Sequence, residues 1–279
     1  MKELIKKLAK ENKISDIGFL KAEKFSAIKE VSKTPFLPEC NERENPFLIM
    51  EDAKTIIVLA FSYYTNTEGN LSMYARGQDY HHVTKKLSSP ILDFLIDAGY
   101  KAEFFCDSAS LNERYLANMA GLGFIGKNGF LISPEFGSYI FLAHIITNYE
   151  ISPDKPNNKT CMACGKCIKA CPTGALSSGD FYSCLSYVTQ KKGELSEKEK
   201  ILIKNNNTCW GCDICQNVCP HNSNLSKTEI SEFREDLICN LTYEDISNRE
   251  FRKKYKNRAF TWRGKGVIDR NLSIIHNID

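Results

Sequence analysis

Nine of the twelve cysteines in this 279-residue chain lie between residues 161 and 219, at spacings that suit metal ligation. The stretches "TCMACGKCIKACP" (160–172) and "TCWGCDICQNVCP" (208–220) each place four cysteines within eleven residues, and a proline follows the last one. In the C-x2-C-x2-C-x3-C-P spacing, three thiolates bind one 4Fe–4S cube and the fourth binds a second cube. The motif occurs twice, so the sequence predicts two 4Fe–4S clusters.

Zinc is the competing metal, but a structural zinc site usually pairs two C-x2-C units across a longer segment. Two cubes need eight ligands, whereas the region holds nine thiols, because Cys184 lies between the two motifs. Spacing alone selects Cys209 as a ligand, since the second motif then mirrors the first, and it leaves Cys184 spare. The cysteines outside the pattern are expected to be buried, inert thiols: Cys40, Cys106 and Cys239.

Two clusters conduct electrons, so the preceding residues should bind the group that receives them. No G-x-G-x-x-G follows a predicted strand and no P-loop is present, which argues against an ordinary nucleotide site. The stretch "YARGQDYHH" (74–82) gathers polar and aromatic side chains at the start of a helix. Asp107 follows a strand and precedes a helix, where α/β folds place ligand sites. A simpler interpretation makes Asp107 or Ser108 the cap of that helix.

The loop "GFIGKNG" (123–129) is glycine-spaced, so its backbone can approach a large ligand closely. Lys127 and Asn128 would then contact the ligand. The alternative is a turn with a solvent-facing lysine.

Residues 1–150 alternate between strand-like and helix-like patterns, which predicts an α/β fold for this part of the chain. The expected strands are 16–20, 55–64 and 101–105, and the expected helices are 79–99, interrupted or restarted at Pro90, and 108–123. A strand pair, 129–133 and 138–147, should follow, joined through "PEFG".

The chain divides into three expected parts around a Pro- and Asn-rich linker at 148–159. These are an α/β domain (1–150), a ferredoxin-like domain (151–225) and a C-terminal helical segment that packs back on the core (226–279). The longest apolar runs, 55–61 and 139–146, are far shorter than the ~20 residues of a membrane helix. The N-terminus lacks the apolar stretch of a signal peptide. We therefore expect a cytoplasmic protein without membrane contact.

The net charge of +3 conceals a basic segment at 249–270, which holds nine Lys or Arg against Glu250 and Asp269 and so carries +7, leaving −4 elsewhere. Four aromatic residues are interleaved with these charges: Phe251, Tyr255, Phe260 and Trp262. The pattern indicates a polyanion-binding face or a solvated helical face whose aromatic rings enter the core. Composition does not decide between them.

The stretch "DSASLNERYLANMAGLGFIGKNGFLISPEFGSYIFLAHIITN" (107–148), with the two cysteine motifs and "SCLSYVTQKKGELSEKE" (183–199), resembles the epoxyqueuosine reductase family. The resemblance extends over about residues 50–265. It implies an α/β domain that binds cobalamin, a ferredoxin-like domain with two 4Fe–4S clusters, and a relationship to reductive dehalogenases. It also implies reduction of epoxyqueuosine to queuosine at the tRNA wobble position, the last step of queuosine synthesis. Family members often carry a helical-repeat extension, so this chain is expected to be a short form.

The resemblance assigns roles by motif. Asp107 is implied as the proton donor, a task for which a carboxyl group needs a buried setting near neutral pH. The implied cobalamin contacts are Arg76, Tyr80, His81, Asp107, Ser108, Ala109, Lys127, Asn128 and Ser186. The implied cluster ligands are Cys161, Cys164, Cys167 and Cys219 for one cube, and Cys171, Cys184, Cys212 and Cys215 for the other. Cys209 is then the spare thiol, in contrast to the spacing argument.

The expected tRNA contacts in the basic segment are Arg252, Lys253, Lys254, Arg258, Arg263 and Lys265. An external electron donor of the flavodoxin or ferredoxin type and a monomeric state are also expected. Two alternatives belong to other functional classes: a ferredoxin-type electron carrier, and a corrinoid reductase of a small molecule. A carrier has no need of the Asp107 site, and a small-molecule enzyme leaves the basic segment unexplained.

Overall fold

The computed structural model describes residues 1–25, 45–107, 111–247 and 250–277. A four-stranded sheet lies at the centre of the N-terminal part, and every neighbouring pair of its strands is antiparallel. Its strands, in spatial order, are β1 (Asp16–Lys21), β2 (Thr55–Ser62), β6 (Ile140–Thr147) and β3 (Ala102–Phe105). The predicted mixture of helices and strands is confirmed. The sheet has no parallel strands, however, so the rule for ligand sites in parallel α/β folds does not account for the place of Asp107.

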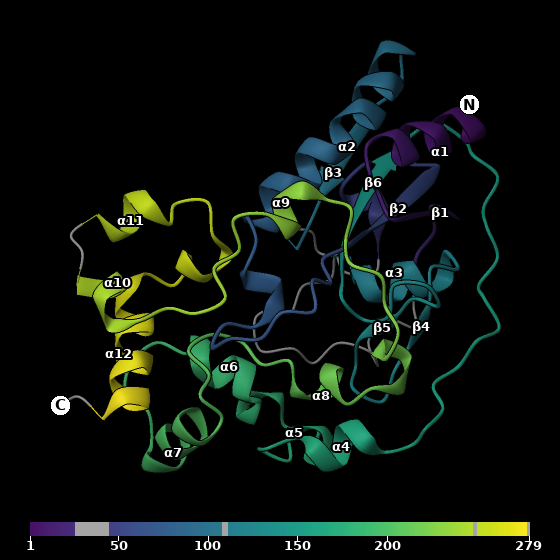
Figure 1. Cartoon of the computed structure of the whole chain (residues 1–279). Coiled ribbons are helices and arrows are strands. Elements are labelled where there is room, and N and C mark those ends of the chain that lie inside the picture. Colours follow the sequence, from purple (N-terminus) through teal and green to yellow (C-terminus); the bar gives the residue numbers. More distant parts are fainter. Residues whose placement is uncertain (26–44, 108–110, 248–249, 278–279) are drawn as a thin grey trace.

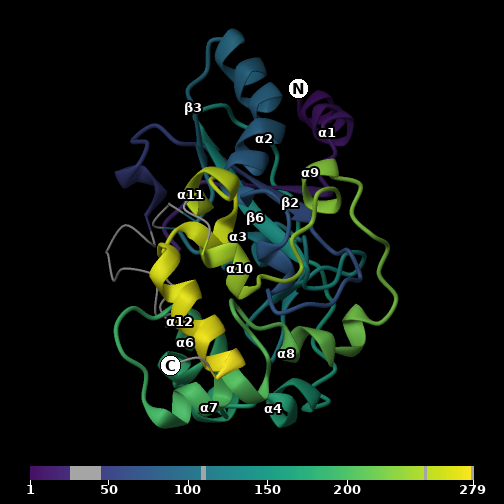
Figure 2. The same ribbon diagram turned by 60° about the vertical axis from the view of Figure 1, so that its left-hand side comes forward.

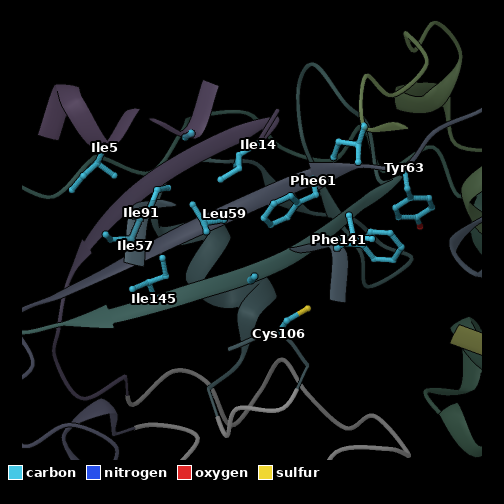
Figure 3. Close-up of a cluster of buried hydrophobic side chains, with 14 of the residues drawn as sticks. Ile5, Ile14, Ile57, Leu59, Phe61, Tyr63, Ile91, Cys106, Phe141 and Ile145 are labelled. Atoms are coloured by element: carbon cyan, nitrogen blue, oxygen red, sulfur yellow. The ribbon is translucent and has the colours of Figure 1, made fainter. Parts of the chain in front are cut away.

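Alternate residues of β2 face opposite sides of the sheet, and both sides are covered. Ile57, Leu59 and Phe61 face α1 (Lys2–Glu11) and α2 (Tyr80–Asp97), as Figure 3 shows. Val58 and its neighbours on the other side pack with α3 (Glu113–Met119). Each such fully buried aliphatic side chain contributes about 1.5–3 kcal/mol. This packing explains why residues 56–61 of β2 are all apolar.

Helix α2 continues through Pro90, so the predicted interruption is wrong. Proline removes the N–H that would bond the carbonyl of Lys86, four residues earlier. The hydroxyl of Ser89 donates to that carbonyl instead, at 2.9 Å. A local side-chain hydrogen bond thus satisfies the acceptor that proline leaves open.

Helix α3 begins at Glu113, and the side chain of Asn112 caps it by accepting from the N–H of Tyr115 at 3.1 Å. The expected start at residue 108 falls in a stretch, 108–110, outside the described residues. The expected strand pair is also partly wrong. β5 (Leu131–Ile132) pairs with β4 (Phe124–Ile125), whereas β6 joins the main sheet because its apolar residues are buried between β2 and β3.

Short helices carry the cysteine-rich region, which lies below the sheet in Figure 1. They are α4 (Lys166–Ala170), α5 (Ala175–Ser178), α6 (Leu185–Gln190), α7 (Glu197–Asn205) and α8 (Ile214–Asn217), with 3-10 turns at Phe181–Ser183 and Pro220–Asn222. Two further 3-10 turns, Pro46–Leu48 and Met73–Ala75, belong to the N-terminal part. Helix α7 has a full capping box, in which Ser196 and Glu199 bond each other's backbone N–H.

The C-terminal segment returns across the molecule in four helices and a 3-10 turn. They are α9 (Ser231–Arg234), α10 (Tyr243–Ser247), α11 (Phe251–Lys254), the turn Ala259–Thr261 and α12 (Lys265–His276). Ile230 and Phe233 pack against the sheet side of the core. Helix α12 lies against α6 and α7, as Figure 2 also shows. Within the described residues, no helix has both the length and the apolar character needed to cross a membrane.

Three of the four aromatic residues of the basic segment are core residues. Phe251, Tyr255 and Phe260 are each at most 2 % exposed and pack with Leu71 and Trp210. Trp262 is 56 % exposed. The alternative in which the rings enter the core is therefore confirmed for the three buried residues, and their side chains are not available to a ligand.

Candidate functional site

Asp107 lies directly after β3 and is held at two points. Its backbone N–H donates to Glu113 Oε1 at 3.0 Å, and its carboxylate accepts a hydrogen bond from the hydroxyl of Tyr80. Its φ of 55° is in the left-handed region, which non-glycine residues rarely occupy and which is common at functional sites. The side chain is exposed. Asn112 caps α3, so the carboxylate of Asp107 does not serve as the helix cap. It is exposed to solvent and accepts from Tyr80 instead.

Glu113 and His144 form a buried pair behind Asp107. Glu113 Oε1 lies 3.5 Å from Nδ1 of His144, whose side chain is fully buried. Burial lowers the pKa of His144 to about 3, so its ring is neutral. Burial, reinforced by the charge of Asp107, raises the pKa of Glu113 well above its usual range. The His144 ring is neutral, so the contact between them is not an ion pair, and burial favours the protonated form of Glu113.

Tyr80 is fixed by its neighbours in an aromatic stack. Its ring lies 4.3 Å from that of Phe141, at an angle of 7°, and 4.2 Å from that of His81. Burial, followed by the charge of Asp107, raises the pKa of Tyr80 well above its usual range, which keeps the phenol protonated as a donor. Asp79 caps α2 and bonds the His81 ring at 2.8 Å, and this bond raises the pKa of His81.

A cavity of about 220 Å³ separates residues 67–76 from the cysteine-rich region. Cys212 and the buried carboxyl of Asp213 form part of its wall. Arg76 also lines it, but its guanidinium donates to the carbonyls of Leu71, at 2.8 Å, and Thr67. Arg76 thus holds the loop that forms the wall.

Tyr74 connects Asp107 to this cavity. Burial raises its pKa, and the charges of Asp213 and Asp107 add to the effect, so the hydroxyl lies within electrostatic range of both. The hydroxyl accepts a hydrogen bond from Nε1 of Trp210 at 2.7 Å. Gln190 also bonds this hydroxyl, and its amide donates to the carbonyl and hydroxyl of Ser186. Ser186 is therefore linked to the site through Gln190.

Four thiols lie within electrostatic range of one another, and one of them, Cys212, lines the cavity: Cys171, Cys184, Cys212 and Cys215. Burial raises the pKa of Cys215, and the three other thiols raise it further. Burial also raises the pKa of Cys212, to about 12. Cys171 differs, because hydrogen bonds from nearby backbone N–H groups and Thr173 outweigh its burial and lower its pKa. Such bonds stabilise a thiolate.

A second group of thiols lies toward the surface: Cys161, Cys164, Cys167 and Cys219. Burial raises the pKa of Cys219, and the charges of the three others contribute. A small cavity of about 10 Å³ lies among them, and Lys127, Asn128 and His221 also line it. The loop between the first two cysteines turns at Ala163, with a φ of 51°. This group is called the outer thiol group below, and the group beside Asp213 is called the inner thiol group.

Cys209 belongs to neither group. It is fully buried in the C-terminal apolar cluster, with Sγ 4.0 Å from the carbonyl of Ile268. Burial alone raises its pKa to about 12. Of the other cysteines outside the motifs, Cys106 is buried as expected, whereas Cys239 is only half-buried. Cys40 lies outside the described residues.

Two of the expected cobalamin contacts, Lys127 and Asn128, line the cavity of the outer thiol group. They lie in the turn after β4, and Arg114 donates to the carbonyl of Gly129 in the same turn. Their contact with cobalamin stays a prediction. Ser108 and Ala109 lie outside the described residues.

The basic segment is only partly available to a polyanion. Arg258 is half-buried and donates to the carbonyls of Arg76, at 2.9 Å, and Asp236, at 2.7 Å, so it holds two loops together. This structural role argues against its expected tRNA contact. Lys253 and Lys254 are exposed but pair with Glu250 and Asp245.

The remaining members of the expected tRNA-contact set differ in exposure. Arg252 is exposed, and Lys265 is half-buried at the start of α12. The guanidinium of Arg263 lies 3.8 Å from the ring centre of Trp262, in a cation–π contact. Arg252 and Lys253 both remain open to solvent, since the Lys253 side chain is 81 % exposed even beside Glu250.

Several residues of the site were not identified from the sequence: Tyr74, Glu113, Arg114, His144 and Asp213. One signal was present, because the charged pair in "NERYLANM" (112–119) begins an otherwise apolar helix. Arg114 donates to the carbonyl of Gly129 at 2.9 Å and lies 5.3 Å from the ring centre of Phe130. Burial lowers its pKa, but the charges of Asp107 and Glu113 oppose this effect.

Comparison with protein families places both halves of the site. Residues 160–222 match the model described as "4Fe-4S double cluster binding domain", and this range contains both thiol groups. Residues 43–108 match the model described as "Epoxyqueuosine reductase QueG, DUF1730", and this range ends at Asp107 and Ser108.

Similar proteins cover nearly the whole chain. Epoxyqueuosine reductase of Lactococcus garvieae is 38 % identical over 98 % of this chain and 85 % of its own length. The Bacillus subtilis enzyme is 34 % identical, over 99 % and 79 % of the two chains. A crystal structure of epoxyqueuosine reductase with a modified tRNA-Tyr stem loop superposes with a TM-score of 0.90 at 31 % identity, covering 99 % of this chain and 81 % of that one. The present chain belongs to the epoxyqueuosine reductase family.

Proposed function

We propose that this protein reduces epoxyqueuosine to queuosine in tRNA, with electrons that pass through two 4Fe–4S clusters to a cobalamin. One observation carries the proposal: the charges of Asp107 and Asp213 both act on the Tyr74 hydroxyl, and Asp213 lies beside the inner thiol group in the wall of the cavity. Tyr74 and Asp213 thus lie between the proposed proton donor and the proposed electron source. A solved structure of the Bacillus subtilis enzyme has its catalytic aspartate loop swung out of the active site, which supports the same role for this loop.

The thiols suit the two clusters in number and chemistry. The outer thiol group supplies four ligands (Cys161, Cys164, Cys167 and Cys219), and the inner thiol group supplies four (Cys171, Cys184, Cys212 and Cys215). The outer group combines three cysteines of the first motif with Cys219 of the second. The inner group combines two cysteines of the second motif and Cys184 with Cys171 of the first. Cys209 is unsuited as a ligand, because its electrostatic environment includes no other thiol.

The cavity beside the inner thiol group suits cobalamin in its position and lining. Loop 67–76, held by Arg76, forms one wall, and Leu185, Cys212 and Asp213 belong to the other. Ser186 follows Leu185 in the chain, and the His81 ring stacks on Tyr80. Bound cobalamin supplies a cobalt centre that transfers electrons to an epoxide carbon.

Asp107 has a defined part in this reaction. Removal of the epoxide oxygen as water consumes two electrons and two protons, and negative charge develops on that oxygen as the carbon–oxygen bond breaks. A carboxyl group placed there donates a proton to it. Tyr80 orients the carboxylate, and Glu113 holds its backbone. The carboxylate of Asp107 is exposed, so water is excluded from it only when a ligand covers it.

The tRNA contacts are assigned to the exposed cations of the basic segment, chiefly Arg252 and Lys253. Phosphate contacts of this kind give affinity and salt dependence without sequence preference. The cavity and Asp107 recognise the modified base itself.

The decisive experiment is reconstitution with iron, sulfide and cobalamin, followed by nucleoside analysis of epoxyqueuosine-containing tRNA incubated with dithionite. We expect queuosine to form with the wild-type protein, and Asp107→Asn to lose ~10²–10⁴ of the rate while retaining corrinoid. Corrinoid binding without conversion of tRNA would indicate a small-molecule reductase. Clusters without corrinoid binding would indicate an electron carrier.

A further inference from the structure

The outer thiol group is the more exposed of the two metal-ligand groups. The Cys164 thiol is exposed, and Met162 beside it is 56 % exposed. The inner thiol group faces the buried Asp213 instead. A protein that delivers electrons can approach the outer group closely without displacing any part of the fold.

The surface around Cys164 is basic. Between Asp154 and Asp180 the sequence contains four lysines and no acidic residue. With Lys127 these form a set of five exposed lysines: Lys127, Lys155, Lys159, Lys166 and Lys169. In the part of the chain that the structure describes, none of their ammonium groups has an ion-pair partner, in contrast to Lys2, which pairs with Asp154 at 2.7 Å. Their charge is therefore available to a partner.

We propose that this exposed surface, which carries Met162 and lysines that include Lys159, Lys166 and Lys169, binds a small acidic one-electron carrier of the flavodoxin or ferredoxin type. The proposal rests on the proposed function and names the partner of its outer cluster. Each reduced carrier gives one electron and leaves oxidised, so two carriers serve each epoxide. An apolar centre with a charged rim is typical of protein interfaces, and electron-transfer complexes are small and transient. Opposite charge speeds their association.

The test compares two triple variants. Lys159→Glu/Lys166→Glu/Lys169→Glu reverses the proposed face, and Lys10→Glu/Lys21→Glu/Lys85→Glu reverses the same charge at exposed lysines of α1, β1 and α2, elements that lie above the cysteine-rich region in Figure 1. Reduced flavodoxin is mixed with oxidised holoprotein, and the loss of cluster absorbance is followed at low and high salt.

We expect the face variant to be reduced at least tenfold more slowly than wild type at low salt, with little remaining salt dependence. The control variant should keep most of the wild-type rate. Dithionite, which needs no docking face, should support equal epoxyqueuosine turnover in all three proteins. Equal rates of reduction by flavodoxin would overturn the proposal. Loss of tRNA affinity in the face variant, with flavodoxin reduction intact, would make the face a tRNA surface. Absence of turnover with dithionite in the wild type would instead reject the proposed function.

A different observation supports a second inference about the same group. Asn128 is 6 % exposed, and its buried Nδ2 has no hydrogen-bond partner among the described residues; the same is true of the buried Nε2 of His221. Both residues line the cavity among the four outer thiols. An unpaired buried donor costs about 1–3 kcal/mol, so an acceptor at this place is strongly favoured.

We infer that Asn128 and His221 donate hydrogen bonds to sulfur atoms of the outer cluster and raise its reduction potential. Such bonds stabilise the additional negative charge of the reduced cube. Asn128→Asp keeps the Oδ1 that accepts from the Phe130 N–H at 3.3 Å but removes the donor. His221→Phe keeps the edge contact with Phe124, at 5.1 Å. Each variant thus removes a donor and retains the packing.

The measurement is a redox titration followed by low-temperature EPR, with the inner cluster of the same molecule as the control. We expect the outer-cluster potential to become more negative in both variants while the inner-cluster potential stays unchanged. Iron analysis should still give close to eight atoms per chain, which tests the clusters independently of this inference. Unchanged outer-cluster potentials would show that the two side chains do not bond the cluster.

Discussion

The hydroxyl of Tyr80 donates a hydrogen bond to the carboxylate of Asp107, although 27 residues separate them in the chain. The Tyr80 ring is stacked on Phe141, so the donor has little freedom to move. The hydrogen bond therefore selects one orientation of the Asp107 side chain.

Tyr80→Phe should lower kcat about 10- to 100-fold, because a hydrogen bond to a charged group contributes about 1.5–3 kcal/mol. KM for tRNA should change little, since the phenyl ring keeps its stacking on Phe141. Steady-state kinetics with dithionite check both values. A rise in KM with unchanged kcat would mean that Tyr80 binds substrate and does not orient Asp107.

Glu113→Gln should be nearly neutral, whereas Glu113→Ala should lose about 3- to 10-fold in kcat. The raised pKa of Glu113 favours its protonated, uncharged form, and a glutamine oxygen can still accept from the Asp107 N–H. Alanine removes that acceptor. A large loss in the glutamine variant would show that the ionised carboxylate is needed, and pH–rate profiles of both variants would locate its titration.

Cys209→Ala should retain close to eight irons per chain, and Cys184→Ala should lose one cluster. Cys209 lies among apolar side chains near Ile268, whereas the charge of Cys184 raises the pKa of both Cys212 and Cys215. Iron analysis and EPR after reduction distinguish the variants. The reverse result would favour the assignment from motif spacing alone.

Arg252→Glu/Lys253→Glu should weaken tRNA binding and flatten its dependence on salt. Each lost phosphate contact reduces the slope of log K against log salt by about 0.7–0.9. The single variant Lys10→Glu, on the exposed side of α1, is the matched control. Arg258 is unsuitable for this test, because its bonds to the Arg76 and Asp236 carbonyls make a charge reversal disruptive. Equal affinity and slope in the double variant would mean that this face does not contact tRNA.

Asp16→Asn should stabilise the protein above pH 6. Burial, and to a lesser degree the charges of Glu135 and Asp154, raises the pKa of Asp16 to about 6 from the ordinary 3.8. The folded state therefore binds more protons than the unfolded state between these values, so wild-type stability should fall as pH rises from about 4 through 6. The loss is at most about 3 kcal/mol. Urea unfolding at pH 4.5 and 7.5 measures it, and an equal pH dependence in the asparagine variant would contradict this origin.

Local spacing and periodicity were enough to predict the two cysteine motifs, most strands and the long helix that begins at Tyr80. These features depend on residues within a few positions of one another, so the sequence records them directly. Local preference also had exceptions. Pro90 predicts a break, yet the Ser89 hydroxyl satisfies the Lys86 carbonyl and α2 continues.

The site depends on contacts that are distant in sequence, and only the tertiary structure decided them. Cys184 and Cys209 are both cysteines near a motif, but packing of α12 on the second motif buries Cys209 away from the other thiols. Lys127 and Asn128 are brought to the outer thiol group by the fold of the β4–β5 hairpin. Asp107 acquires its two tethers from helices α2 and α3. Residue types determined which chemistry was available, and the burial of apolar surface determined which of those residues meet.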